Sequence, residues 1–248
     1  MTTYAPVAMA DDRIALVSGG ADGLGRAITD RLLAAGAQVA VCGRSQPDEL
    51  PSGARFFVAD VRDADEVDEL VTAVVDRFGR LDVVVTEPGG SPRAEAATAS
   101  ATFSTSILTL NLLAPLHLAT AANRVMQDQD DGGAIVTIGS LSGVHPAPGA
   151  AAYGAAKAGL IHLTSSLAAE WGPKVRVNCV SAETPAHGED EPDPAASPFG
   201  RTATAGEVAD AVAYLASPAS AYVTGTNLVV HGGGERPAFL AAIAGDGA

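Results

Sequence analysis

Short apolar runs rich in β-branched residues alternate along the chain with longer stretches in which apolar residues recur every three or four positions. The short runs are typical of strands buried on both faces, and the longer period is typical of helices with one buried face. The predicted strands are residues 14–17, 39–42, 55–59, 81–85, 134–138, 175–180 and 227–230. The predicted helices are residues 23–35, 64–78, 96–123, 151–171 and 206–216.

Strands that alternate with helices in this way indicate a parallel sheet covered by helices on both faces. We therefore predict a single doubly wound α/β domain of the Rossmann type over residues 1–248, with a seven-stranded, mostly parallel sheet. No linker or internal repeat divides the chain. An acidic, Pro-rich stretch begins at residue 184, after the sixth predicted strand, where connecting loops lie at the carboxyl edge of the sheet. Residues 184–204 are either a solvated loop or a lid over the substrate.

The composition of the chain limits the classes of partner that it is expected to bind. The net charge of −14 repels phosphate backbones and anionic lipid headgroups, so we expect neither a nucleic-acid partner nor a membrane surface. Two isolated cysteines and an N-terminus without a targeting pattern favour the cytoplasm. Residues 96–123 carry no Asp, Glu, Lys or Arg, but they contain too many Ser, Thr and Asn residues for a bilayer span. That stretch better fits a helix packed against the sheet or another subunit.

A glycine-rich turn separates the first predicted strand from the first predicted helix. Glycines permit a tight turn and a close approach of the backbone to a pyrophosphate, and the helix N-terminus presents free N–H groups to it. The context of a strand before and a helix after supports a nucleotide site. The expected cofactor contacts in this turn are Ser18, Gly19, Asp22, Gly23, Leu24 and Gly25.

Tyr153 and Lys157 are four residues apart on a predicted helix, so they share one face. Only two lysines occur in the chain, which makes this spacing informative. A tyrosine titrates near pH 10, and a neighbouring ammonium group together with an oxidised nicotinamide would favour its phenolate. The pair therefore predicts general acid–base chemistry at Tyr153.

These features together resemble the short-chain dehydrogenase/reductase family over residues 13–234. The turn has the family's Gly-x-x-x-Gly-x-Gly spacing, the helix has its Tyr-x-x-x-Lys pair, and Ser140 precedes Tyr153 by the family's 13 residues. The resemblance implies hydride transfer between a nicotinamide cofactor, NAD(P)(H), and a ketone or secondary alcohol. It makes the catalytic residues Asn111, Ser140, Tyr153 and Lys157.

The resemblance also implies the role of each residue. Ser140 positions the substrate oxygen, Lys157 also binds the nicotinamide ribose together with Tyr153, and Asn111 holds a water in a proton relay. The Asp60-Val61 pair contacts adenine, and Gly89 belongs to the cofactor site. No metal is implied. Family members commonly form homotetramers or homodimers, so we expect such an assembly.

The second predicted strand indicates which dinucleotide is used. An acidic residue at its end would bind the adenosine ribose, but this chain has Gly43 followed by Arg44. A guanidinium group suits a 2′-phosphate, which favours NADP(H) over NAD(H). Two observations oppose this: Arg44 could be a solvated loop residue, and Asp22 stands where NADP-dependent members often carry a basic residue.

Two family motifs are altered. The usual Asn-Asn-Ala-Gly reads Thr86-Glu87-Pro88-Gly89, and the usual Pro-Gly reads Ala182-Glu183, with His187 replacing a later Thr. Glu87 and Glu183 bring negative charge towards an anionic cofactor, which leaves open a binding or regulatory protein as the alternative to an enzyme.

The substrate is expected to be a neutral or lipophilic ketone or alcohol, because an acidic lid disfavours substrates tethered to a carrier protein or to coenzyme A. The candidate pocket residues are Leu141, Ser142, Val144, His145 and Pro148, with the lid over 184–199.

Overall fold

The computed structural model describes residue 9 and residues 12–87, 89–182 and 197–234. Seven strands form one sheet in the order β3-β2-β1-β4-β5-β6-β7, and all neighbouring strands are parallel. The strands are β1 (Ile14–Ser18), β2 (Gln38–Gly43), β3 (Arg55–Val58), β4 (Val83–Thr86), β5 (Gly133–Ile138), β6 (Val175–Ala182) and β7 (Asn227–Val230). The predicted doubly wound α/β fold is confirmed.

Six α-helices and three shorter helical turns connect these strands in the described part of the chain. They are α1 (Gly23–Ala34), α2 (Ala64–Phe78), α3 (Ala101–Leu108), the π-helical turn η1 (Thr109–Leu113), α4 (Ala114–Asp128), the 3₁₀ turn η2 (Leu141–Gly143), α5 (Ala151–Trp171), α6 (Ala205–Ala216) and the 3₁₀ turn η3 (Pro218–Ser220).

The prediction of one helix over 96–123 was wrong at both ends. The helical stretch begins after Ser100, whose side chain caps it by accepting a hydrogen bond from the Phe103 N–H at 3.1 Å. It continues to Asp128, beyond the uncharged stretch, because the polar residues of its last turns lie on its outer side while Met126 remains buried.

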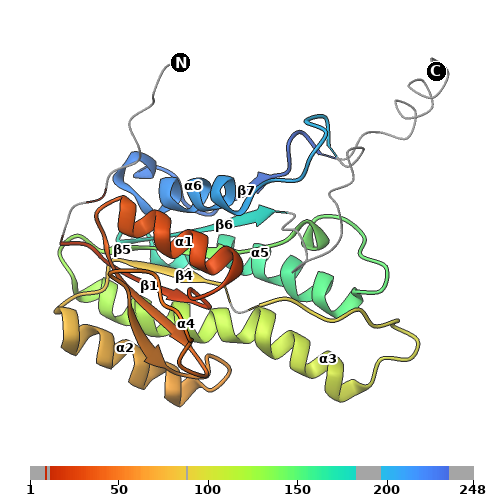
Figure 1. Ribbon diagram of the computed structural model, residues 1–248, viewed down its shortest axis with the longest axis horizontal. Helices are drawn as coiled ribbons and strands as arrows, with labels where there is room; N and C mark the ends of the chain where they lie inside the picture. Colours follow the sequence, from red (N-terminus) through yellow and green to blue (C-terminus); the bar gives the residue numbers. More distant parts are fainter. Residues whose placement is uncertain (1–8, 10–11, 88, 183–196, 235–248) are drawn as a thin grey trace.

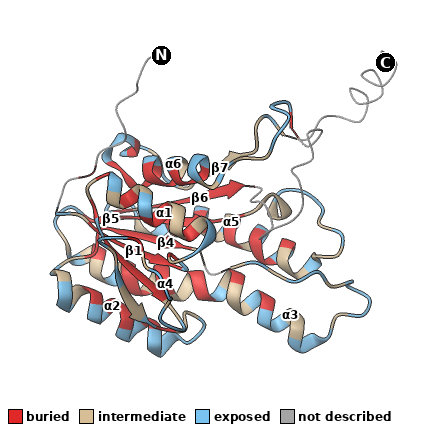
Figure 2. Cartoon of the chain, viewed as in Figure 1, coloured by how far each residue is buried: buried red, intermediate tan, exposed pale blue. Residues whose placement is uncertain are grey.

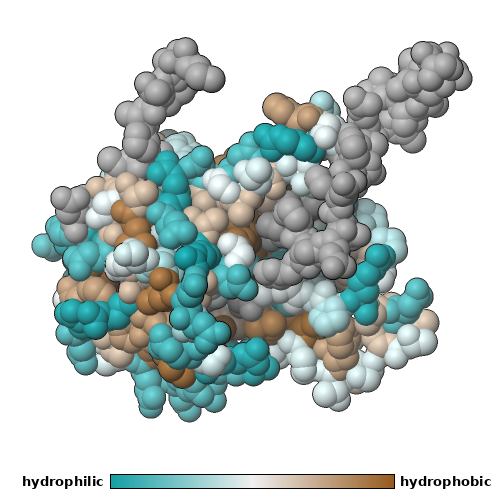
Figure 3. Space-filling view, in the orientation of Figure 1, coloured by the Kyte–Doolittle hydropathy of each residue, from teal (hydrophilic) through white to brown (hydrophobic). Residues whose placement is uncertain are grey.

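Alternate residues of each strand supply two separate cores. Val17 and Val41 belong to the core under α1 and α6, whereas their neighbours Leu16 and Ala40 belong to the core under α2, α4 and α5. The helices therefore form a layer on each side of the sheet (Figure 1), and the five inner strands are mostly buried, whereas the edge strands β3 and β7 are not (Figure 2). The acidic outer side of α2 contributes to the hydrophilic surface in the lower left of Figure 3.

The helical stretch Ala101–Asp128 is long enough to cross a membrane and contains an 18-residue window with a mean hydropathy of 1.3, which is apolar enough to do so. Its position gives a different reason for that composition. Leu118, Ala122 and Met126 are fully or almost fully buried in the core with α2 and the sheet, and α4 packs against α2. The stretch is a core helix of this fold.

The order of the strands places a crevice at the carboxyl edge of the sheet, between β1 and β4. From β1 the chain builds the sheet in one direction through β2 and β3, and it then returns to β4 on the other side of β1. Such a switch point is where open α/β sheets bind their ligands, because the loops that follow the two strands diverge there. The glycine turn follows β1 and Glu87 follows β4 at this point.

The opposite edge of the sheet is held together by a buried carboxylate. The Asp82 side chain is 2% exposed and accepts hydrogen bonds from Arg13 at 2.7 Å, from Arg80 at 2.7 Å and from the backbone N–H of Ile14 at 2.9 Å. Arg80 also pairs with Asp131, at the start of the connection to β5. One side chain thus links β1, β4 and the segment before β5.

We expect Asp82→Ala to lower the free energy of unfolding by about 3 kcal/mol, because it leaves two arginines and a backbone N–H without their buried partner. Urea unfolding followed by circular dichroism measures this change. Asp68→Ala is the matched control, since Asp68 pairs with Arg124 in the open, and its loss should cost less than about 1 kcal/mol. Equal losses in the two variants would contradict the structural role of Asp82.

Candidate active site

The predicted pair of Tyr153 and Lys157 lies on one face of α5, with Lys157 Nζ 5.5 Å from the centre of the tyrosine ring. Lys157 is 2% exposed, and its ammonium group donates a hydrogen bond to the Ile138 carbonyl at 2.8 Å. Ile138 ends β5, so α5 is anchored to the carboxyl edge of the sheet by the same lysine. Ser140 follows two residues later and contributes its hydroxyl to the same region.

The pKa of Tyr153 is raised above its ordinary value, mainly by burial. The Ser140 hydroxyl opposes this by hydrogen bonding, whereas the charge of Glu87 raises the pKa of the phenol further. The expectation that Lys157 lowers the pKa of Tyr153 is therefore not met, because burial raises this pKa by more than the hydrogen bond with Ser140 lowers it. A phenol in this state keeps its proton at neutral pH and can donate it to a carbonyl oxygen.

Asn111 lies in the π-helical turn between α3 and α4, where the widened backbone leaves carbonyl groups for a side chain to bind. Its amide donates to the Ile107 carbonyl at 3.1 Å, while its Oδ1 is buried without a partner among the described residues. A buried amide oxygen of this kind calls for a hydrogen-bond donor such as a water molecule. The role of Asn111 in holding a water stays a prediction.

Glu87 connects the glycine turn with the catalytic pair. Its N–H donates to Ser18 Oγ at 2.9 Å, and its backbone and carboxylate oxygens would lie 2.3 and 2.9 Å from a Cβ added at Gly19. Burial raises the pKa of Glu87 to about 7, although the charge of Lys157 opposes the shift. Burial likewise lowers the pKa of Lys157 to about 8, against the attraction of Glu87. Pro88, the next altered residue of this motif, lies outside the described residues.

A cavity of about 220 Å³ opens beside the turn at the ends of β1, β2 and β3. Five of the predicted cofactor residues meet there, and Arg62 and Leu110, which the sequence did not single out, also line the cavity. The lining residues are Ser18, Gly19, Cys42, Gly43, Arg44, Ala59, Asp60, Val61, Arg62 and Leu110. The size, the apolar walls and the polar rim of this cavity fit the adenosine half of a dinucleotide.

The two arginines that line this cavity differ in their ion pairing. Arg62 binds the Asp60 carboxylate through Nε at 2.9 and 3.0 Å, which lowers the pKa of Asp60. Arg44 is exposed and takes part in none of the ion pairs found among residues 12–87, 89–182 and 197–234. The sequence signal for Arg62 was its position two residues after Asp60, which allows a local side-chain pair.

The remaining predicted turn residues lie outside this cavity. Asp22 caps α1 by accepting a hydrogen bond from the Gly23 N–H at 2.7 Å, which is a structural role that requires no cofactor. Gly25 packs so closely on the turn that a Cβ there would lie 2.1 Å from the Gly19 carbonyl oxygen. Leu24 packs against the core under α1, and Gly89 has a left-handed φ of 127° after β4.

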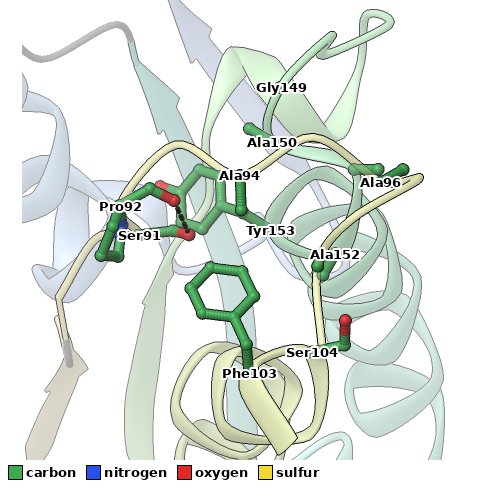
Figure 4. A pocket seen from close by; sticks show the side chains of 12 residues that line it. Ser91, Pro92, Ala94, Ala96, Phe103, Ser104, Gly149, Ala150, Ala152 and Tyr153 are labelled. Carbon is green, nitrogen blue, oxygen red and sulfur yellow. Dashed lines mark hydrogen bonds between the residues drawn. The ribbon is translucent and has the colours of Figure 1, made fainter. Parts of the chain in front are cut away.

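A second cavity, of about 240 Å³, has Tyr153 in its wall. The rings of Tyr153 and Phe103 come together from α5 and α3, and the loop through Ser91 and Pro92 closes over them (Figure 4). Small side chains form most of its wall. The lining residues are Ser91, Pro92, Ala94, Ala96, Ala99, Phe103, Ser104, Gly149, Ala150, Ala151, Ala152 and Tyr153.

None of the five residues predicted for the substrate pocket lines this cavity. Leu141, Ser142, Val144, His145 and Pro148 are not among its lining residues, and Val144 and His145 are exposed. The segment 91–104 takes their place, because it follows β4 and so reaches the same edge of the sheet as the loop after β5. Of the expected lid, residues 184–196, with His187, lie outside the described residues, as does Glu183. The described residues contain no cluster of His, Cys, Asp and Glu suited to a metal ion.

Comparison with known proteins gives consistent matches along the chain. A family model described as enoyl-(acyl carrier protein) reductase matches residues 19–235. The chain is 35% identical over 247 residues to L-fucose dehydrogenase of Bos taurus, covering 90% of this chain and 89% of that one. It is 34% identical over 238 residues to 3-oxoacyl-[acyl-carrier-protein] reductase of Escherichia coli, covering 90% and 97%.

Among solved structures, a dehydrogenase/reductase from Sinorhizobium meliloti is similar to this chain with a TM-score of 0.83 and 30% sequence identity. The match covers 92% of this chain and 96% of that one. The similarity therefore extends over most of the length of both chains.

Proposed function

The chain belongs to the short-chain dehydrogenase/reductase family and is an NAD(P)-dependent oxidoreductase, and we propose that it uses NADP(H) to interconvert a small neutral ketone and its secondary alcohol, with Tyr153 as the general acid–base. The observation that carries the proposal is the position of Tyr153, between the cavity walled by small side chains and the buried Lys157.

The cofactor, when bound, supplies or accepts a hydride at its nicotinamide ring. Side chains of this protein transfer the proton and position the substrate oxygen. In the reducing direction, the Tyr153 phenol gives its proton to the carbonyl oxygen while Ser140 holds that oxygen by a hydrogen bond. In the oxidising direction, Tyr153 takes the proton back from the alcohol.

Lys157 and Asn111 return the proton to Tyr153. The ammonium group of Lys157 lies beside the phenol ring and would stabilise a transient phenolate. Asn111 has a buried oxygen without a partner among the described residues, and it would hold a water between Lys157 and the π-helical turn η1. The pKa of Lys157, lowered to about 8 by burial, suits a group that must exchange protons near neutral pH.

The preference for NADP(H) rests on Arg44. The adenosine cavity offers no carboxylate free to bind the ribose diol, because Asp60 is already bound by Arg62. The Arg44 guanidinium stands at the rim, exposed and without a carboxylate partner among the described residues, where it can bind a 2′-phosphate.

We expect Arg44→Ala to weaken NADPH binding by about tenfold or more, the value of one charge-assisted contact, and to leave NADH binding within about twofold. Isothermal titration calorimetry with both dinucleotides measures the two affinities. Arg124→Ala is the control, because Arg124 is an exposed arginine on α4 that pairs with Asp68. A wild-type preference for NADH would refute the role given to Arg44, and binding of neither dinucleotide would refute the cofactor assignment.

The substrate class follows from charge and cavity shape. The net charge of −14 disfavours docking of an acidic carrier protein, and half of the twelve residues that line the cavity beside Tyr153 are alanines. Both features support a compact, uncharged substrate held by its polar carbonyl at one end.

We also propose that the protein forms a homo-oligomer in the cytoplasm. Leu108 and Leu113 are 37% and 42% exposed on the helical stretch around Asn111, a surface suited to packing against a second copy in a homotetramer or homodimer. The cytoplasm provides the reducing conditions that suit two free, buried cysteines.

A further inference from the structure

Glu87 is a half-buried acid between the adenosine cavity and Tyr153, where a dinucleotide that reaches both would pass. One side of it touches Gly19, which lines that cavity, and the other side senses Lys157 and Tyr153 through their charges. A buried ionised carboxylate is costly unless it is paired, and Glu87 forms no salt bridge within 4.0 Å among the described residues.

The charged and titratable groups around Glu87 determine whether its carboxyl group is ionised. From α5 it faces Lys157, which favours the anion, and Tyr153, which is neutral at physiological pH. Behind Lys157, on β6, burial raises the pKa of the Cys179 thiol, so that group is neutral as well. On the turn after β1 the nearest acid is Asp22, whose carboxylate is directed to the Gly23 N–H. Lys157 is therefore the one cation among the described residues that supports an ionised Glu87.

A bound dinucleotide changes this balance, because it brings a pyrophosphate with negative charge to the glycine turn. A carboxylate against Gly19 would repel it, whereas a carboxylic acid is neutral and carries an O–H donor. The family's Asn at this position is likewise neutral and has a donor. Resting on the proposed function, we propose that Glu87 takes up one proton from solvent when the dinucleotide binds and donates a hydrogen bond to it as a neutral acid.

The direction of the pH effect follows from linkage. The pKa of Glu87 in the free protein is already raised to about 7, and an anionic ligand raises it further. Below pH 7 the free protein holds the proton already, so affinity is insensitive to pH there. Above pH 7 the complex holds a proton that the free protein has lost, so affinity falls by up to about tenfold per pH unit.

The test compares wild type with Glu87→Gln, which has the same shape and is permanently neutral. Dissociation constants for NADPH and NADH are measured by calorimetry at pH 6 and pH 8. We expect equal affinities at pH 6 and about tenfold tighter binding by Glu87→Gln at pH 8. The other titrating groups, including the 2′-phosphate of NADPH, are present in both proteins, so the difference between the two profiles isolates Glu87. Glu95→Gln is the control, because Glu95 is an exposed acid on the same loop after β4.

Titrations at pH 8 in two buffers of different ionisation enthalpy count the protons directly. Wild type should take up close to one more proton per dinucleotide than Glu87→Gln does. Parallel pH profiles, equal proton uptake, or weaker binding by Glu87→Gln at both pH values would each overturn the inference while leaving the oxidoreductase assignment intact. Absence of dinucleotide binding in both proteins at both pH values would overturn the cofactor assignment and this inference together.

Discussion

Tyr153→Phe is expected to lower kcat for ketone reduction by about 10²–10⁴-fold, because it removes the only group proposed to give a proton to the carbonyl oxygen. The ring remains, so its contacts with Phe103 and Lys157 and the shape of the cavity are kept. The dissociation constant for the dinucleotide should change by less than about threefold.

The measurement is a screen of neutral ketones with NADPH, followed by its absorbance, with dinucleotide affinity determined in parallel. Tyr222→Phe is the control, because Tyr222 is fully exposed near the start of β7. Since burial raises the pKa of Tyr153 above its ordinary value of 10, the wild-type kcat for reduction at saturating NADPH should persist through neutral pH and fall only in strong alkali. Substantial turnover by Tyr153→Phe would refute the assignment of the acid–base.

Gly25→Ala is expected to weaken dinucleotide binding by more than about 100-fold. The added carbon would lie 2.1 Å from the Gly19 carbonyl oxygen and 3.0 Å from the Gly20 Cα, so the backbone of the turn must move. A turn that has moved away from the helix N-terminus no longer aims its N–H groups at a pyrophosphate.

Gly206→Ala tests whether the effect belongs to the turn rather than to glycine replacement in general. Gly206 lies in the first turn of α6 with open space around it, and alanine should leave binding unchanged while stabilising the helix by about 0.5–1 kcal/mol. Both variants are compared by calorimetry with NADPH and by thermal unfolding. Near-normal affinity in Gly25→Ala would show that the turn does not hold the cofactor.

Local patterns were sufficient for most elements of the fold. The bounds of α2 and α5 were predicted at the residues where they occur, because Asp63 caps one and the helical period of both ends at a glycine. The start of α3 was missed, since the three alanines and one threonine of residues 96–99 have no period that separates loop from helix. The start of β4 was predicted two residues early, because Leu81 and Asp82 are buried by contacts with Gln129 and Arg13 rather than by pairing in the sheet.

The site was predictable where it depends on spacing along one element and not where it depends on contact between elements. The positions of Tyr153 and Lys157 follow from the helical repeat. The contact of Glu87 with Gly19 depends on the distance between β1 and β4 in the finished sheet, which no local pattern contains. The raised pKa of Tyr153 likewise depends on how deeply α5 is buried.

The buried Asp82 cluster also bears on how this protein can change during evolution. It ties β1 and β4 together at the edge opposite to the chemistry, so the sheet does not depend on the loops around Tyr153 for its connection. Segment 91–104 can therefore accumulate substitutions that reshape the cavity at little cost to folding. New substrate preferences can arise in this chain by drift in that loop, while the acid–base pair and the glycine turn stay unchanged.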